Sequence, residues 1–198
     1  AGRKPPARHK ANGAIHYLKL DANDGVSVKT ALADAYMLIN ATGLFSGDNR
    51  YDVARMCAQT GTHYVDLADN REYISNFGSL ANEAERYNVL LITAAGASPS
   101  LSALLADTLE GEFDRISSIR VYRSAGNRNP GGPASLRSLL EQIGAVVRVR
   151  QQGRWHNVGV WSNSQVIRFP RPVGRRRCYC VDAPELDALV ERFNADSV

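Results

Sequence analysis

The stretch 35–99 constrains the fold more than any other part of the sequence, because short apolar runs alternate there with helical patterns. The runs 36–43, 61–67 and 89–96 have the length and apolar content of strands, and amphipathic helical segments separate them. This strand–helix–strand–helix–strand order predicts a parallel sheet, with the first strand buried on both faces. Ligands of such sheets bind beyond the carboxyl ends of the strands, so those ends are the first place to expect a site.

The residues before this stretch predict one more strand and helix. Residues 14–21 carry the apolar pattern of a strand that ends at Asp21, and Asp24 or Ser27 can cap the helix that follows. Residues 1–4 resemble the end of a further strand, and there is no initiator Met. We therefore expect the chain to begin inside a domain.

The pattern changes after Gly111. Residues 115–123 alternate apolar and polar side chains, which predicts a strand with one solvated face. An apolar stripe over 136–147 predicts one helix of about four turns. Short strands and a final helix are expected further on, at 155–160, 165–169, 178–181 and 184–193.

These patterns predict an α/β fold in two parts. Residues 1–110 are expected to form a partial dinucleotide-binding domain, a Rossmann-like parallel sheet that lacks its N-terminal strand. Residues 111–198 are expected to form a second, smaller α/β domain with a mixed sheet, for substrate binding and dimerisation. The apolar surface of this second part predicts a homodimer.

Composition limits the partners. The 198 residues, 44% of them hydrophobic, contain no apolar run near the roughly 20 residues that cross a bilayer, so no membrane partner is expected. The net charge of +4 is dispersed apart from the start of the chain and 175–177, and no nucleic-acid motif accompanies it. The three arginines of 175–177 are expected at a solvated edge or turn. Three cysteines favour free thiols and a reducing, cytoplasmic compartment.

No metal site or nucleophile motif is expected. The four histidines are scattered, and Cys178 and Cys180 lack the two further ligands of a closed zinc site. Ser98 follows Gly96 but lacks the second glycine of a nucleophile elbow.

A dinucleotide site normally contains a glycine-rich turn, and the sequence has no G-x-G-x-x-G. On spacing, that turn belongs upstream of Ala1. Arg3 would suit the 2′-phosphate of NADP, or is simply a solvated charge. Asp21 could contact adenine, or forms a turn or helix cap. The turn with Asn40, Thr42 and Gly43 allows close approach of a ligand, or is an ordinary turn.

Tyr64 and Asp66 form the constellation with the most chemical promise. On a strand they share one face, while His63 and Val65 point the other way. A phenol and a carboxylate at a strand end could orient a substrate amine or relay a proton. Alternatively, Tyr64 is a core residue with its hydroxyl bound to backbone and Asp66 caps a turn.

Five runs of the sequence stand in the order and spacing of the saccharopine dehydrogenase-like family: 1–3, the strand that ends at Asp21, 38–45, 61–66 and 94–100. The run Gly-Thr-His-Tyr-Val-Asp at 61–66 is the most specific, and the likeness covers about residues 1–109 well. The resemblance implies an NADP-binding Rossmann domain followed by an α/β domain. It also implies that the cofactor is held by the following residues: Gly2, Arg3, Asp21, Asn40, Ala41, Thr42 and Gly43.

The function expected from this resemblance is that of an NADP-dependent oxidoreductase with a small-molecule substrate. It would act on an amino-acid-derived secondary amine or imine, or on a related C=N or C=C bond, with Tyr64 and Asp66 as catalytic residues. The alternative is a non-catalytic module of the same fold that senses dinucleotides or dimerises. Because the glycine-rich turn is missing, activity is expected of the full-length protein and not of these 198 residues alone.

Overall fold

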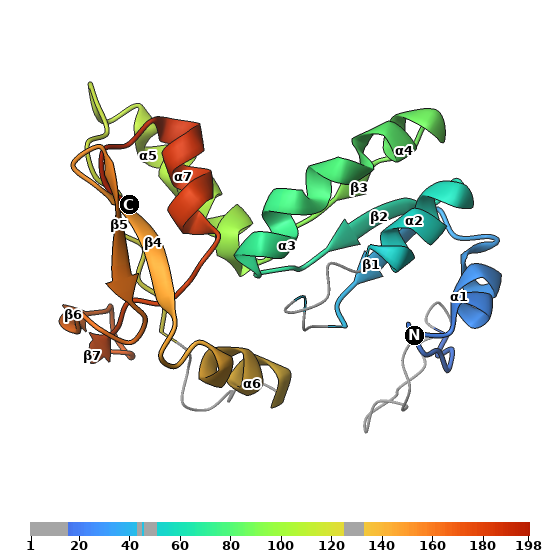
Figure 1. Cartoon of the computed structure of the whole chain (residues 1–198), viewed down its shortest axis with the longest axis horizontal. Helices are drawn as coiled ribbons and strands as arrows, with labels where there is room; N and C mark the ends of the chain where they lie inside the picture. The colour runs from blue at the N-terminus through green and yellow to red at the C-terminus, as the bar shows by residue number, and fades with distance from the viewer. Residues whose placement is uncertain (1–15, 43–44, 46–50, 125–132) are drawn as a thin grey trace. The chain divides into compact units, whose positions relative to one another are not determined.

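The computed structural model describes residues 16–42, 45, 51–124 and 133–198 (Figure 1). The chain divides into two compact units. Unit 1 consists of Ala1–Thr42, Asn49–Asp66 and Phe77–Ile92, and unit 2 of Gly43–Asp48, Leu67–Asn76 and Thr93–Val198. The two domains expected over 1–110 and 111–198 stay a prediction.

Unit 1 is built on a three-stranded parallel sheet. Its strands are β1 (Met37–Asn40), β2 (His63–Asp66) and β3 (Leu91–Ile92), in the order β1-β2-β3. Helix α2 (Asp52–Gln59) joins the first two strands, and η1 (Phe77–Leu80) and α4 (Ala81–Arg86) precede the third. The alternation predicted over 35–99 is therefore confirmed as mixed α/β structure with a parallel sheet.

The helix ends of unit 1 follow local sequence signals. Helix α1 (Gly25–Leu32) begins after Asp24, whose carboxylate accepts a hydrogen bond from the backbone N–H of Val26 at 3.2 Å. This confirms Asp24 as the predicted cap. Asn88, just beyond α4, has a φ of 52°, the left-handed conformation that commonly ends a helix.

The core of unit 1 lies between the helices and one face of the sheet. Helix α2 packs against α1, α4 and β2, and the buried side chains include Leu32, Cys57, Tyr64 and Leu80. This places Cys57 in the core of unit 1.

One prediction for β1 is wrong, since the strand is not covered on both faces within the described part of the chain. Met37 is 40% and Ile39 65% exposed, whereas Leu38 and Asn40 on the other face are partly buried. The pleat sends alternate side chains to opposite faces. The helices of unit 1 pack on the face that carries Tyr64, so the face of Ile39 stays open.

The strand predicted for 14–21 is also not seen. Residues 14 and 15 lie outside the described residues, and 16–21 contain only an isolated bridge position at Lys19. Asp21 Oδ1 accepts hydrogen bonds from the backbone N–H of Asn23 at 3.0 Å and from its side-chain amide at 3.3 Å. Such a local turn competes with extended structure and directs the chain into α1.

Unit 2 combines helices with two antiparallel hairpins. The helical segments are α3 (Arg71–Asn76), the kinked segment η2 (Ala97–Leu101), α5 (Ser102–Glu110), α6 (Pro133–Glu141) and α7 (Glu185–Phe193). The hairpins pair β4 (Val146–Gln151) with β5 (Arg154–Gly159), and β6 (Gln165–Arg168) with β7 (Arg175–Cys178). Val147, Val149 and Val160 form a small core beneath the first hairpin.

The mixed sheet predicted for the second part of the chain is corrected to these two separate antiparallel sheets. Among the described residues, the expected strand at 115–123 forms only one parallel bridge, between Ser118 and Ser197 near the end of the sequence. An alternating pattern indicates which face of a segment is apolar, and it does not by itself supply a strand for the segment to pair with. Arg175, Arg176 and Arg177 form most of β7.

The helix predicted through Val147 ends earlier, at Glu141. Gly144 has a φ of 81°, which stops the helix, and Val147 and Val149 then alternate inward on β4. No helix among the described residues is both long enough and apolar enough to cross a membrane.

Candidate functional site

The carboxyl ends of β1 and β2 bring three polar side chains together in unit 1. The strands are parallel and in register, so that Leu38 lies opposite Tyr64 and Asn40 opposite Asp66. Because residues two apart share a face, Asn40, Tyr64 and Asp66 all project to the same side of the sheet. The pattern of the sequence predicted the shared face of Tyr64 and Asp66, and the register adds Asn40 to it.

These three residues form a continuous hydrogen-bonded network. The amide Nδ2 of Asn40 donates to the Tyr64 hydroxyl at 3.0 Å, and that hydroxyl donates to Asp66 Oδ2 at 3.1 Å. The hydrogen bonds are therefore donated in one direction along the network, from the amide to the phenol and from the phenol to the carboxylate.

Thr42 sets the orientation of the Asn40 amide. The backbone N–H of Thr42 donates to Asn40 Oδ1 at 3.1 Å, and its hydroxyl donates to the same oxygen at 2.8 Å. With Oδ1 held by two donors, Nδ2 is directed toward Tyr64. Ala41 and Thr42 are exposed and Asn40 is half-buried, so the network runs from the surface inward.

The inner end of the network is fully buried. Tyr64 is 1% and Asp66 0% exposed. The ring of Tyr64 stacks on Phe77 with 6.1 Å between centroids, and Phe77 in turn meets Tyr51 edge to face at 5.6 Å. Burying a carboxylate without hydrogen bonds costs free energy, so the hydrogen bond from the Tyr64 hydroxyl helps to stabilise Asp66 in its buried position.

This arrangement has a definite chemical capacity. A ligand at the carboxyl edge would meet the Asn40–Thr42 turn first, while Tyr64 and Asp66 lie beneath it and orient the Asn40 amide. The chain of hydrogen bonds could also carry a proton between Tyr64 and Asp66, since the phenol already donates to the carboxylate. Catalytic roles for Tyr64 and Asp66 stay predictions.

The other residues predicted for the cofactor are placed as follows. Asp21 forms the turn before α1 through its bonds to Asn23. Gly2, Arg3 and Gly43 lie outside the described residues. Asn40, Ala41 and Thr42 are the part of the predicted set that the structure brings to the edge of the sheet.

Unit 2 contains a charged cluster that sequence reasoning missed. The Arg71 guanidinium donates from Nε and Nη2 to the two oxygens of Asp187, and from Nη1 to Asp182 at 3.2 Å and to the Arg148 carbonyl at 3.0 Å. The hydrogen bond to Asp187 is the main cause that raises the pKa of Arg71. These residues line a hollow of about 280 Å³ together with Glu72 and Ser75.

A second missed group is Glu185, which is 4% exposed at the start of α7. Ser98 donates to one of its oxygens at 2.6 Å and Ser102 to the other at 2.8 Å. The partners are more than 80 residues apart in the chain, so no local pattern could have revealed them.

Comparison with known proteins adds no relative. A scan against protein-family models finds no match, and a search of the curated proteins finds no sequence similar to this chain. The fold and the site by themselves define a mixed α/β protein that has polar side chains at the carboxyl edge of a parallel sheet.

Proposed function

We propose that this chain is the dinucleotide-binding part of an NADP-dependent oxidoreductase similar to the saccharopine dehydrogenase-like family. Its substrate would be an amino-acid-derived secondary amine or imine, or a related C=N or C=C compound. The observation that carries the proposal is the Asn40–Tyr64–Asp66 network at the carboxyl ends of two adjacent parallel strands. This is the position where sheets of a Rossmann-like kind bind their ligands.

The residues at this edge fit the polar part of a nucleotide. The exposed Thr42 and the half-buried Asn40 offer hydroxyl and amide groups at the surface end of the network. NADPH, when bound, supplies the hydride. Tyr64 and Asp66 are proposed as the catalytic residues, which would relay a proton along the hydrogen bond between them while they hold the Asn40 amide in one orientation.

The cofactor preference is tested by titrating NADPH and NADH against the protein expressed from its complete reading frame. We expect NADPH to bind more tightly, because an arginine pairs well with the 2′-phosphate and the resemblance implies Arg3 for that contact. Arg3→Ala should cost about 1.5 to 3 kcal/mol, or roughly 10- to 150-fold in NADPH affinity. Equal affinities of the unaltered protein for the two cofactors would contradict the proposal.

The 198-residue chain itself should bind NADPH weakly. No G-x-G-x-x-G occurs in it, so it lacks the turn that normally holds the pyrophosphate. Calorimetric titration of this chain measures the affinity directly. Tight binding at a 1:1 ratio would mean that the phosphate site lies within these residues.

A second candidate is a non-catalytic module of the same fold that senses dinucleotides or dimerises. It is favoured by the burial of Tyr64 and Asp66, whose polar atoms lie away from solvent. The two functions differ in one measurable property, hydride transfer. Oxidation of NADPH in the presence of an imine substrate supports the enzyme, whereas binding without turnover supports the module.

A further inference from the structure

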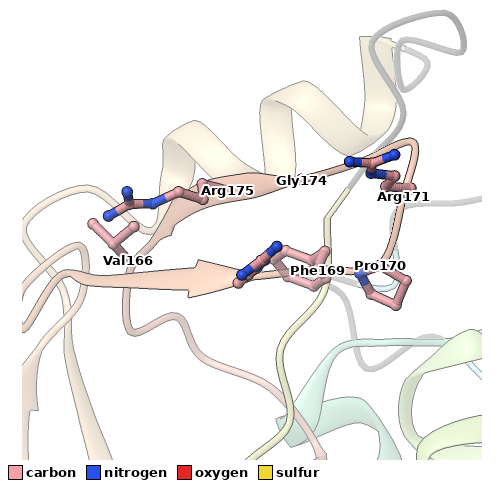
Figure 2. Close-up of a pocket in the computed structure, with 7 residues that line it drawn as sticks. Val166, Phe169, Pro170, Arg171, Gly174 and Arg175 are labelled. Carbon is pink, nitrogen blue, oxygen red and sulfur yellow. The ribbon is translucent and has the colours of Figure 1, made fainter.

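The β6–β7 hairpin of unit 2 surrounds a hollow of about 660 Å³ that plays no part in the proposed function. Figure 2 shows the hollow, with Val166 and Arg175 at one end and Arg171 and Pro170 at the turn. Its lining is arginine and apolar surface: Val166, Arg168, Phe169, Pro170, Arg171, Gly174 and Arg175. The volume is in the range of small-molecule sites, about 300 to 1,000 Å³.

The register of the hairpin sets two like charges against each other. Arg168 lies directly opposite Arg175, and Val166 shares their face because it is two residues from Arg168. Like charges directly opposite on an antiparallel pair destabilise it. An anion between the two guanidinium groups would remove that repulsion.

The turn holds a third arginine in place. The backbone N–H of Phe169 donates to the Gly174 carbonyl at 2.9 Å, and that of Val173 donates to the Pro170 carbonyl at 3.0 Å. Gly174 has a φ of 69°, a conformation that favours glycine. Arg171 is therefore carried on a closed turn.

Within the described residues, acidic side chains do not balance the charges of these three arginines. Within the described part of the chain, no carboxylate forms an ion pair with Arg168, Arg171 or Arg175, and all three side chains are exposed. By contrast, Arg71 and Arg192 are each paired with an aspartate. The hollow thus has a local excess of positive charge without internal compensation.

We propose that this hollow binds a soluble small molecule that carries two or more phosphate groups. Arginine forks match phosphate oxygens in geometry and charge, and three of them line one hollow. Phe169, Pro170 and Val166 give the non-phosphate part of the ligand an apolar surface to pack on. The site is independent of the carboxyl edge of the parallel sheet, and so of the function proposed for that edge.

The test is calorimetric titration of the 198-residue chain with inorganic pyrophosphate, and then with ADP. We expect saturable 1:1 binding that weakens about tenfold to a hundredfold in the double variant Arg168→Gln/Arg175→Gln. The matched control is Arg86→Gln/Arg154→Gln, which removes the same charge from exposed arginines outside the hollow. Its affinity should stay within about twofold, because neither arginine lines the hollow and salt screens charges that do not contact the ligand.

Three results would overturn the proposal. They are the absence of saturable pyrophosphate binding, an equal loss of affinity in the control, and binding to vesicles of anionic phospholipid without binding to pyrophosphate or ADP. If the double variant does not fold, as judged by circular dichroism, Arg171→Gln replaces it, since that residue lies in the turn outside both strands. An affinity of Arg171→Gln equal to that of the unaltered chain would also overturn the proposal.

Discussion

Tyr64 is the residue on which the polar network at the sheet edge depends. Its hydroxyl is the middle member of the network, and its ring packs on Phe77 in the core of unit 1. Removing the hydroxyl oxygen alone therefore separates the hydrogen bonding of this side chain from the packing of its ring.

We expect Tyr64→Phe to lower the free energy of unfolding by about 1 to 3 kcal/mol, because Asn40 and the buried Asp66 each lose a hydrogen-bond partner. Urea denaturation followed by circular dichroism measures the change. Tyr36→Phe is the matched control, since Tyr36 is 78% exposed, and it should change stability by less than about 0.5 kcal/mol. Equal effects of the two substitutions would show that the network does not stabilise the fold.

Cys57 provides a second test at a single side chain. It is 0% exposed, and burial raises the pKa of its thiol from 9.0 to about 12. We expect it to react with an aromatic disulfide reagent at pH 8 roughly a hundredfold more slowly than the partly exposed Cys178 and Cys180. Three equally fast thiols would contradict the burial of Cys57.

The same shift in pKa has a direct effect on stability. The folded state disfavours the thiolate, so the stability contributed by protonated Cys57 is fully present below about pH 9. It is lost as the pH rises from there toward 12. In Cys57→Ala, the unfolding free energy should therefore decrease less between about pH 9 and pH 12 than in the unaltered protein. Urea denaturation at several pH values measures this difference.

At the level of whole elements, hydrogen bonds from the Arg71 side chain connect α3 with α7 and β4 within unit 2. One guanidinium reaches Asp187 on α7, Asp182 before it, and the Arg148 carbonyl on β4. The side chain is 13% exposed, so water replaces these bonds poorly.

Arg71→Lys should lower the unfolding free energy by about 1 to 3 kcal/mol, because an ammonium keeps the charge but lacks the fork that contacts both oxygens of Asp187. Arg55→Lys is the control. Arg55 makes a single exposed ion pair with Glu83, so its change should be below about 1 kcal/mol. Thermal or urea unfolding measures the stability of both variants. If Arg71→Lys were as stable as Arg55→Lys, the hydrogen bonds of Arg71 would not stabilise unit 2.

For the whole molecule, α6 carries the exposed apolar surface on which we expect the chain to dimerise. Leu136, Leu139 and Leu140 of α6 are 41% to 59% exposed, and Ile143, just beyond the helix, is 63% exposed. Contiguous apolar surface of this kind commonly marks an interface between subunits.

Leu136→Glu/Leu140→Glu should weaken dimerisation by at least about tenfold, since it buries charge in the expected interface. Sedimentation velocity at several concentrations measures this. Leu105→Glu on α5, at a leucine that is 58% exposed, is the matched control and should leave the association unchanged. A protein that is monomeric at high micromolar concentration would count against the homodimer.

The sequence by itself determined the elements whose signals are local. The alternation of apolar strands and amphipathic helices was enough to predict the parallel sheet of unit 1, and side chains near in sequence were enough to predict the Asp24 cap. The shared face of Tyr64 and Asp66 follows from the period of a strand alone.

Only the tertiary structure decided which distant groups meet. Asn40 and Tyr64 are 24 residues apart, and Arg71 and Asp187 are 116 apart, so their hydrogen bonds depend on how the chain folds back on itself. The same holds for Val147, which fitted a helical stripe but pairs with Val158 in a hairpin. A periodic pattern records which side of an element is apolar, whereas its partner is set by packing between segments far apart in the sequence.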